Sequence, residues 1–262
     1  MLWSTRSWFR TRSHTWTSRS GPAARGRVGA PGAVSWPIRR WVILIACVTT
    51  ALIVAVTVNL DRARPDPAAH AHAVAALAVL VRVPTVPRRP DRDDYERGAF
   101  GVAWTDAVSV RGGHNGCDTR NDILRRDLSD VTVGPVRSCP SAILSGEFRS
   151  PYTGDTVVFR RDRGATAAQI DHIVPLALSW DMGAWSWPAE RRADFANDPA
   201  NLVAVDGESN QAKSDAEPAV WMPPLTAFHC RYAVQFVEVV AGYGLSIDMA
   251  SRKVLADVLE SC

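Results

Sequence analysis

The sequence lacks any pair of cysteines with C-x-x-C spacing, although it contains five cysteines in 262 residues. This absence excludes a zinc knuckle, which needs closely spaced thiolate pairs. Cys47 lies in an apolar run, which leaves four cysteines for disulfides. The pairs Cys117–Cys139 and Cys230–Cys262 would close the shortest loops. In an oxidising compartment each bridge would stabilise the fold by about 3 kcal/mol. The alternative is four buried free thiols.

Acidic residues are absent from residues 1–40, which contain eight arginines. A segment so rich in Arg, Ser, Thr, Gly, Pro and Trp cannot bury a core, and its composition predicts a disordered basic segment. Because the formal charge of the whole chain is +3, residues 41–262 sum to −5. The larger part of the chain is mildly acidic, so its net charge gives no support for binding to nucleic acid.

Charged residues are also missing from residues 41–58, WVILIACVTTALIVAVTV, which directly follow Arg39 and Arg40. As a helix this run would be about 27 Å long, against about 30 Å for the hydrocarbon core of a bilayer. The preceding arginines favour a cytoplasmic N-terminus. We expect residues 41–60 to form a transmembrane signal anchor. A cleaved signal peptide and a buried helix of a soluble protein are the alternatives.

The rest of the chain divides by composition into a linker at 61–94, a folded domain at 95–224 and a helical extension at 225–262. Three prolines keep the second half of the linker extended, after an Ala/Val-rich piece that could form a short helix. The pattern of the domain is that of an α+β fold. Strands are expected within 131–148, 157–159, 170–176 and 202–205, and helices at 189–196, after a Ser209 cap, at 225–243 and after an Asp248 cap.

The chemistry of the chain is concentrated in residues 171–218, which begin D-H-I-V-P-L. They continue with N-L-V-A-V from Asn201 and N-Q-A-K-S-D from Asn210. Asp171 and His172 bring an oxygen ligand and an imidazole base to one point of the chain. The two asparagines supply neutral amides, which can hydrogen-bond or offer an oxygen to a hard metal ion.

This order of residues, Asp-His, Asn and Asn, resembles the HNH motif of the ββα-metal nucleases. The nine-residue spacing of the asparagines and the flanking D-H-I-V-P resemble the HNH domain of CRISPR effector nucleases. The intervening sequence is more similar to small actinobacterial HNH-family proteins related to the C-terminal nuclease domain of GmrSD-type restriction enzymes, over roughly residues 95–224. The resemblance implies a ββα-metal (HNH) core with added strands and C-terminal helices, here preceded by the N-terminal transmembrane helix.

The resemblance also implies a metal-dependent endonuclease that hydrolyses DNA. His172 would be the general base, a role worth about 10²–10⁴ in rate, and Asn201 would hold the loop and orient that base. Asp171 and Asn210 would bind one divalent metal ion, with Mg²⁺ favoured and Mn²⁺ also able to serve. Such an ion polarises the phosphate and stabilises the leaving 3′ oxygen.

Two basic residues are candidates for binding the substrate. Lys213 could neutralise a phosphate oxygen or could simply lie on the surface. Arg120 could contact a phosphate or could pair with a carboxylate in the core. There is one conflict: adjacent residues of a regular strand point to opposite faces, so Asp171 and His172 cannot both face one site unless the strand ends or distorts there.

The expected location is a membrane anchor with an extracytoplasmic catalytic domain, or secretion. A different class of function is also open: a non-catalytic module for envelope or cell-surface interactions, built on the HNH scaffold. The third alternative is an intracellular restriction-type nuclease whose first sixty residues result from a misassigned start. No protein partner can be identified from the sequence.

Overall fold

The computed structural model describes residues 36–62, 67–163 and 167–262, and the chain divides between Asp61 and Arg62 into two compact units. Most of the expected basic segment lies outside the described residues. Residues 36–40, however, already belong to helix α1 (Trp36–Arg62). Within α1, Ile38–Thr57 is long and apolar enough to cross a membrane, and none of this stretch is buried. Signal sequences and membrane anchors share these properties.

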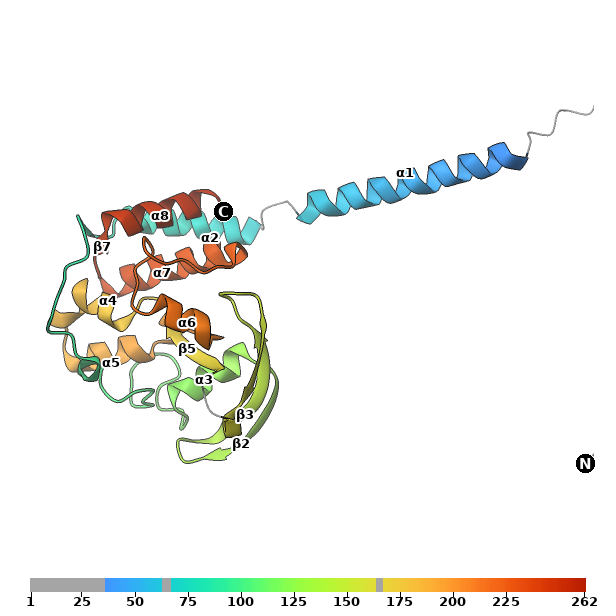
Figure 1. Ribbon diagram of the computed structural model, residues 1–262. Helices are drawn as coiled ribbons and strands as arrows, with labels where there is room; N and C mark the ends of the chain where they lie inside the picture. Colours follow the sequence, from blue (N-terminus) through green and yellow to red (C-terminus); the bar gives the residue numbers. More distant parts are fainter. Residues whose placement is uncertain (1–35, 63–66, 164–166) are drawn as a thin grey trace, which may run out of the picture. The chain divides into compact units, whose positions relative to one another are not determined.

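The second unit is a mixed α/β structure (Figure 1). Its helices are α2 (Pro67–Leu80), α3 (Thr119–Asp127), α4 (Leu176–Asp181), α5 (Ala189–Asn197), α6 (Gly207–Lys213), α7 (His229–Tyr243) and α8 (Met249–Glu260). Its strands are β1 (Thr85–Val86), β2 (Ser129–Val136), β3 (Cys139–Arg149), β4 (Thr156–Arg160), β5 (Ala168–His172), β6 (Leu202–Asp206) and β7 (Ile247–Asp248). Five short 3-10 turns complete it: η1 (Arg97–Phe100), η2 (Arg161–Arg163), η3 (Ala184–Ser186), η4 (Pro199–Asn201) and η5 (Thr226–Phe228).

The centre of this unit is a two-stranded antiparallel ribbon, β5 with β6, in which Asp171 is opposite Val203 and His172 opposite Leu202. Helix α6 follows β6 directly. Its N-cap is Asp206, whose side chain accepts a hydrogen bond from the Ser209 amide at 2.8 Å, so the expected cap at Ser209 is wrong by three positions. A carboxylate at the N-cap also suits the positive end of the helix dipole.

Strand β5 is shorter than the 170–176 segment expected to form it, because it ends at His172. The amide of Ile173 donates to the Asn201 carbonyl, and that of Val174 donates to the Asn201 side chain, both at 2.8 Å. Pro175 has no amide proton to continue a strand, and α4 begins at Leu176. The chain therefore leaves the sheet immediately after the Asp-His pair.

The β5–β6 ribbon separates two hydrophobic cores. On one side, Ile170, Leu202 and Ala204 pack with α3 and the three-stranded sheet β2-β3-β4. On the other side, Val205 joins the larger core built by α2, α4, α5, α7 and α8. Figure 1 shows this division, with α2, α7 and α8 on one side of β5 and the β2–β3 hairpin on the other.

The expected linker at 61–94 is instead part of the folded unit from residue 67 onward. In α2, Ala73, Ala76 and Leu80 are at most 2 % exposed, and the helix packs against α7 and α8. Strand β1 then pairs in parallel with β7. The small alanine side chains allow close approach of the helices, so a composition typical of a linker here forms a core helix. The segment 225–262 is likewise not a separate extension, because Tyr232 and Phe236 of α7 are buried in the larger core.

Both expected disulfides are present. Cys117 is bonded to Cys139 at the start of β3, and Cys230 in α7 is bonded to Cys262 after α8. Cys47 is free and exposed on α1. The other expected elements occur within a few residues of their predicted positions, including β4, α5, β6 and the Asp248 cap of α8.

Candidate active site

His172 is a buried histidine with one ring nitrogen held and the other available. Nε2 lies 2.9 Å from the carbonyl oxygen of Ala196 at the end of α5, and because a carbonyl can only accept, Nε2 carries the proton. Nδ1 then has the lone pair, and no described residue donates a hydrogen bond to it. Burial, with a smaller contribution from the nearby Arg97, lowers the pKa of His172 to about 4, so the imidazole is neutral at pH 7. A neutral, oriented imidazole is the state that a general base requires.

The imidazole lines a pocket of about 280 Å³, near the lower limit for small-molecule sites. The ring of Trp104 lies parallel to it, with centroids 5.8 Å apart and planes 13° apart. Trp104 has a φ of 59°, an unfavourable left-handed conformation for a bulky residue, and its carbonyl accepts a hydrogen bond from the Thr119 amide at 3.1 Å. This strained backbone places the indole over His172.

Two polar residues share the pocket with His172, Arg97 from η1 and Asn197 from the end of α5. The Asn197 amide nitrogen donates to the Ala193 carbonyl at 2.9 Å. Its Oδ1 is buried and has no hydrogen-bond partner among the described residues. The remaining lining is mostly apolar and includes Phe100 and Leu176.

Asp171 lies on the opposite face of β5, as regular strand alternation requires. Its Oδ2 accepts hydrogen bonds from the Tyr152 hydroxyl at 2.5 Å and from the Lys213 ammonium at 2.7 Å. Lys213 also donates to the His172 carbonyl at 2.6 Å. Lys213 and Tyr152 are fully buried. Burial lowers the pKa of Lys213, which Asp171 partly offsets, and raises that of Tyr152, so the phenol stays a donor.

Asn201 is fully buried and holds the turn that follows β5. Its side chain forms two hydrogen bonds with the backbone of Val174, accepting from the amide at 2.8 Å and donating to the carbonyl at 3.2 Å. Asn201 thus fixes the backbone next to His172 without lining the pocket. The two hydrogen bonds tie the turn that follows His172, and the expected role of Asn201 in orienting a catalytic base stays a prediction.

The oxygens expected to bind a metal ion lie on the Asp171 side of the ribbon. Asn210 uses its amide nitrogen to bind the Gln169 side chain at 2.7 Å. No described residue donates a hydrogen bond to Oδ1 of Asp171 or to Oδ1 of Asn210, so one carboxylate and one amide oxygen are available as hard ligands. Within the described ranges, no cluster of three His, Cys, Asp or Glu side chains could hold a metal ion. Neither Asp171 nor Asn210 lines the His172 pocket.

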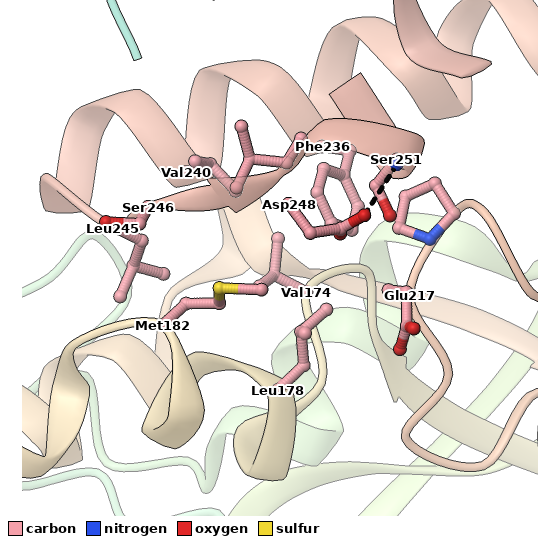
Figure 2. A pocket seen from close by; sticks show the side chains of 12 residues that line it. Val174, Leu178, Met182, Glu217, Phe236, Val240, Leu245, Ser246, Asp248 and Ser251 are labelled. Carbon is pink, nitrogen blue, oxygen red and sulfur yellow. Dashed lines mark hydrogen bonds between the residues drawn. The ribbon is translucent and has the colours of Figure 1, made fainter. Parts of the chain in front are cut away.

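Two other cavities suit a phosphodiester less well. A groove of about 810 Å³ runs beside α6, but Asp155, Asp206 and Glu208 line it and would repel an anion. A cavity of about 10 Å³, shown in Figure 2, lies among side chains of α4, α7 and the junction of β7 with α8. At this junction the Asp248 side chain accepts a hydrogen bond from the Ser251 amide. It has room for about one water molecule. The His172 pocket is therefore the candidate site.

Residues 118–258 match the family model of the C-terminal domain of GmrSD restriction endonucleases. The chain belongs to this family. A GmrSD C-terminal domain is of the HNH type, which confirms the resemblance found in the D-H…N…N pattern. The chain is also 37% identical, over 210 residues, to an uncharacterized secreted protein of Arthroderma benhamiae. That alignment covers 72% of this chain and 95% of the fungal protein. No solved structure matches the chain.

In this GmrSD C-terminal domain, neither expected substrate-binding residue is exposed to solvent as a free cation. Lys213 is not a surface lysine, because it is buried in the pair with Asp171. Arg120 is half-buried and donates to the Ala168 carbonyl at 3.0 Å. It supports the core as expected, but through a backbone oxygen and not through an ion pair with a carboxylate.

The pocket instead brings in three residues to which the sequence assigned no role in a site: Arg97, Trp104 and Asn197. Arg97 and Trp104 belong to the opening segment of the domain, more than sixty positions before His172. Asn197 lies in A-N-D-P, close to Asn201 but outside the D-H…N…N pattern. Asn197 carried no local signal in the sequence; the structure identifies it through its neighbour Ala196, whose carbonyl binds His172.

Proposed function

We propose that the chain is an exported or membrane-anchored nuclease that hydrolyses phosphodiester bonds of DNA, with His172 as the general base. Membership in the GmrSD C-terminal domain family supports nuclease chemistry. The observation that carries the proposal is the state of His172: neutral, fixed by Ala196 through Nε2, and with a free Nδ1 facing a pocket.

In the proposed reaction, Nδ1 of His172 takes a proton from a water molecule as the water oxygen attacks the phosphorus. The bond between phosphorus and the 3′ oxygen breaks, and the leaving oxygen gains a proton from solvent. The products are a 5′-phosphate and a 3′-hydroxyl. Asn201 acts as a positioning residue, because it fixes the backbone that follows His172.

We further propose that the free oxygens of Asp171 and Asn210 would hold one divalent ion, Mg²⁺ or Mn²⁺. Because Asp171 and His172 point to opposite faces of β5, such an ion would stabilise the leaving oxygen only for a phosphodiester bound at the end of the strand, which stops at His172. Two protein ligands, with water and substrate in the other positions, suit Mg²⁺. The strand β5, the strand β6 and the helix α6 would then correspond to the ββα unit of HNH nucleases.

The location is proposed from two features. Both disulfides require an oxidising compartment, and the relative in Arthroderma benhamiae is described as secreted. The helix α1 would deliver the chain to the membrane, either as an anchor or as a signal sequence.

The test is cleavage of a supercoiled plasmid by the full chain, purified in detergent under oxidising conditions. We expect cleavage with Mg²⁺, loss of cleavage in EDTA, and a decrease of about 10²–10⁴-fold for His172→Ala. Asn210→Ala should raise the Mg²⁺ concentration needed for half-maximal rate. If the folded, oxidised chain cleaves nothing with any divalent ion, the alternative of a non-catalytic envelope module on the HNH scaffold takes precedence.

A further inference from the structure

Among the residues that the structure describes, Arg97 is the only arginine or lysine that lines the His172 pocket, and it is exposed to solvent. Four other arginines of the described residues, Arg89, Arg92, Arg126 and Arg160, are paired with carboxylates. Arg89 is paired with three carboxylates, those of Asp181, Asp215 and Glu217. Arg97 forms no ion pair with a described carboxylate; the neighbouring Tyr95 hydroxyl interacts with it. Its positive charge is therefore not neutralised by the protein.

The backbone that carries Arg97 is held in place. Arg97 begins the short turn η1, and the Ala99 carbonyl of that turn accepts a hydrogen bond from Nε of Arg192 at 2.8 Å. Gly101 caps the end of the turn: it has a φ of 84°, and its amide donates to the Gly98 carbonyl at 3.0 Å. Any residue other than glycine would be strained in this backbone conformation. The guanidinium thus extends from a fixed point beside the general base.

No other described residue supplies a cation to the pocket for an anionic substrate. Residues 41–262 carry a net charge of −5, so the field of this part of the chain does not attract DNA. Phe100, Trp104 and Leu176 are uncharged, and the buried Oδ1 of Asn197 can only accept a hydrogen bond. A guanidinium is well suited to a phosphate, since it can donate two parallel hydrogen bonds to its oxygens.

We propose that Arg97 binds the phosphate of the nucleic-acid substrate at the His172 pocket and is the main electrostatic anchor of the substrate. The inference rests on the proposed nuclease function and specifies the group that holds the anion. It replaces Lys213 and Arg120, the residues that the sequence suggested for this role.

The experiment measures binding without turnover. The full chain carrying His172→Ala is titrated against a fluorescein-labelled 12-nucleotide single strand and the matching duplex, at several NaCl concentrations. Adding Arg97→Gln to the His172→Ala chain should weaken binding about 10- to 100-fold. It should also reduce the slope of the logarithm of the binding constant against the logarithm of the NaCl concentration by about one. Arg97→Lys should retain part of the affinity, because the charge remains. Arg137→Gln, the same charge change in the exposed β2–β3 turn, should leave binding unchanged.

Equal affinity and equal salt slope for Arg97→Gln and its parent would overturn the proposal, as would equal losses for Arg97→Gln and Arg137→Gln. Absence of measurable binding by the parent at low salt would also overturn it. Failure of the nuclease proposal is recorded separately, as absence of plasmid cleavage by the chain with intact His172. A chain that cleaves DNA but binds it independently of Arg97 would retain its function and lose this anchor. Circular dichroism spectra and melting temperatures confirm that each variant is folded.

Discussion

Asp171 and His172 are adjacent in the chain, but they lie on opposite faces of strand β5 and in different surroundings. On one face, Asp171 is enclosed by Tyr152 and Lys213 in a buried network. On the other face, His172 keeps a free nitrogen beside an open pocket. One face surrounds a carboxylate with hydrogen-bond donors, and the other keeps an imidazole neutral by burying it. The comparison shows that two adjacent residues of one strand can lie in opposite electrostatic environments, because their side chains point to opposite faces.

The closed face should show the largest effect on stability. Lys213→Met leaves the Asp171 carboxylate buried with one partner fewer, and we expect a loss of about 3–5 kcal/mol in the free energy of unfolding. Urea unfolding at pH 7 measures this loss.

The buried site also distinguishes lysine from arginine, although the chain has two lysines, Lys213 among them, and 28 arginines. Lys213→Arg should also destabilise, because the buried site offers too few acceptors for a guanidinium. A loss below about 1 kcal/mol for Lys213→Met would contradict the buried pair.

The open face should show its effect in the pH dependence of activity. His172 must be neutral to accept a proton, so activity is present above its pKa and lost as the pH falls through it. With the pKa near 4, cleavage at pH 5 should remain close to the rate at pH 7. A histidine with the ordinary pKa of about 6.5 would retain roughly 4% of its pH 7 rate at pH 5. The measurement is kcat/KM against pH on a fixed oligonucleotide, and an acidic limb centred near 6.5 would contradict the buried state of His172.

A smaller loss of stability is expected when Asp171 loses its other partner, the Tyr152 hydroxyl. Tyr152→Phe removes the hydroxyl that donates to Oδ2 but leaves Lys213 in place, so we expect a loss of about 1–2 kcal/mol. Adding Lys213→Met to this variant should give a non-additive change, since both groups bind one oxygen. Thermal or urea unfolding of the two single variants and the double variant measures the coupling. Strict additivity would show that the network is weaker than its geometry indicates.

The sequence predicted those parts of the fold that depend on local signals. The strand at 202–205, the helix from Ala189 and the cap at Asp248 follow from periodicity and capping residues, and the disulfides follow from the smallest loops. A short helix was expected in the Ala/Val-rich piece that forms α2, but its place in the core was missed, because its alanines look like a linker until α7 and α8 cover them. Their spacing, with Ala73, Ala76 and Leu80 inward, was the only local sign of burial.

The candidate site was predicted only in part, for a related reason. His172 and Asn201 were singled out by the resemblance of the D-H…N…N pattern to the HNH motif, although 201 − 172 = 29 positions separate them in the chain. Arg97 and Trp104 reach the pocket through a loop whose path is fixed by tertiary contacts, including the bond between Thr119 and the Trp104 carbonyl. The burial of Lys213 likewise depends on Tyr152 and Asp171, which lie on other strands and turns. Sequence spacing carries no information on such contacts.

The Cys117–Cys139 disulfide also bears on where the protein can be active. Cys117 closes the loop that follows Trp104, and Cys139 starts β3, so the wall of the pocket is anchored through an oxidised bond. Such bonds do not persist in a reducing cytosol, and losing a native one typically costs about 2–5 kcal/mol. Assembly of the wall would therefore be favoured only once the chain has left the compartment in which it was made. A nuclease built in this way would spare the genome of the cell that produces it.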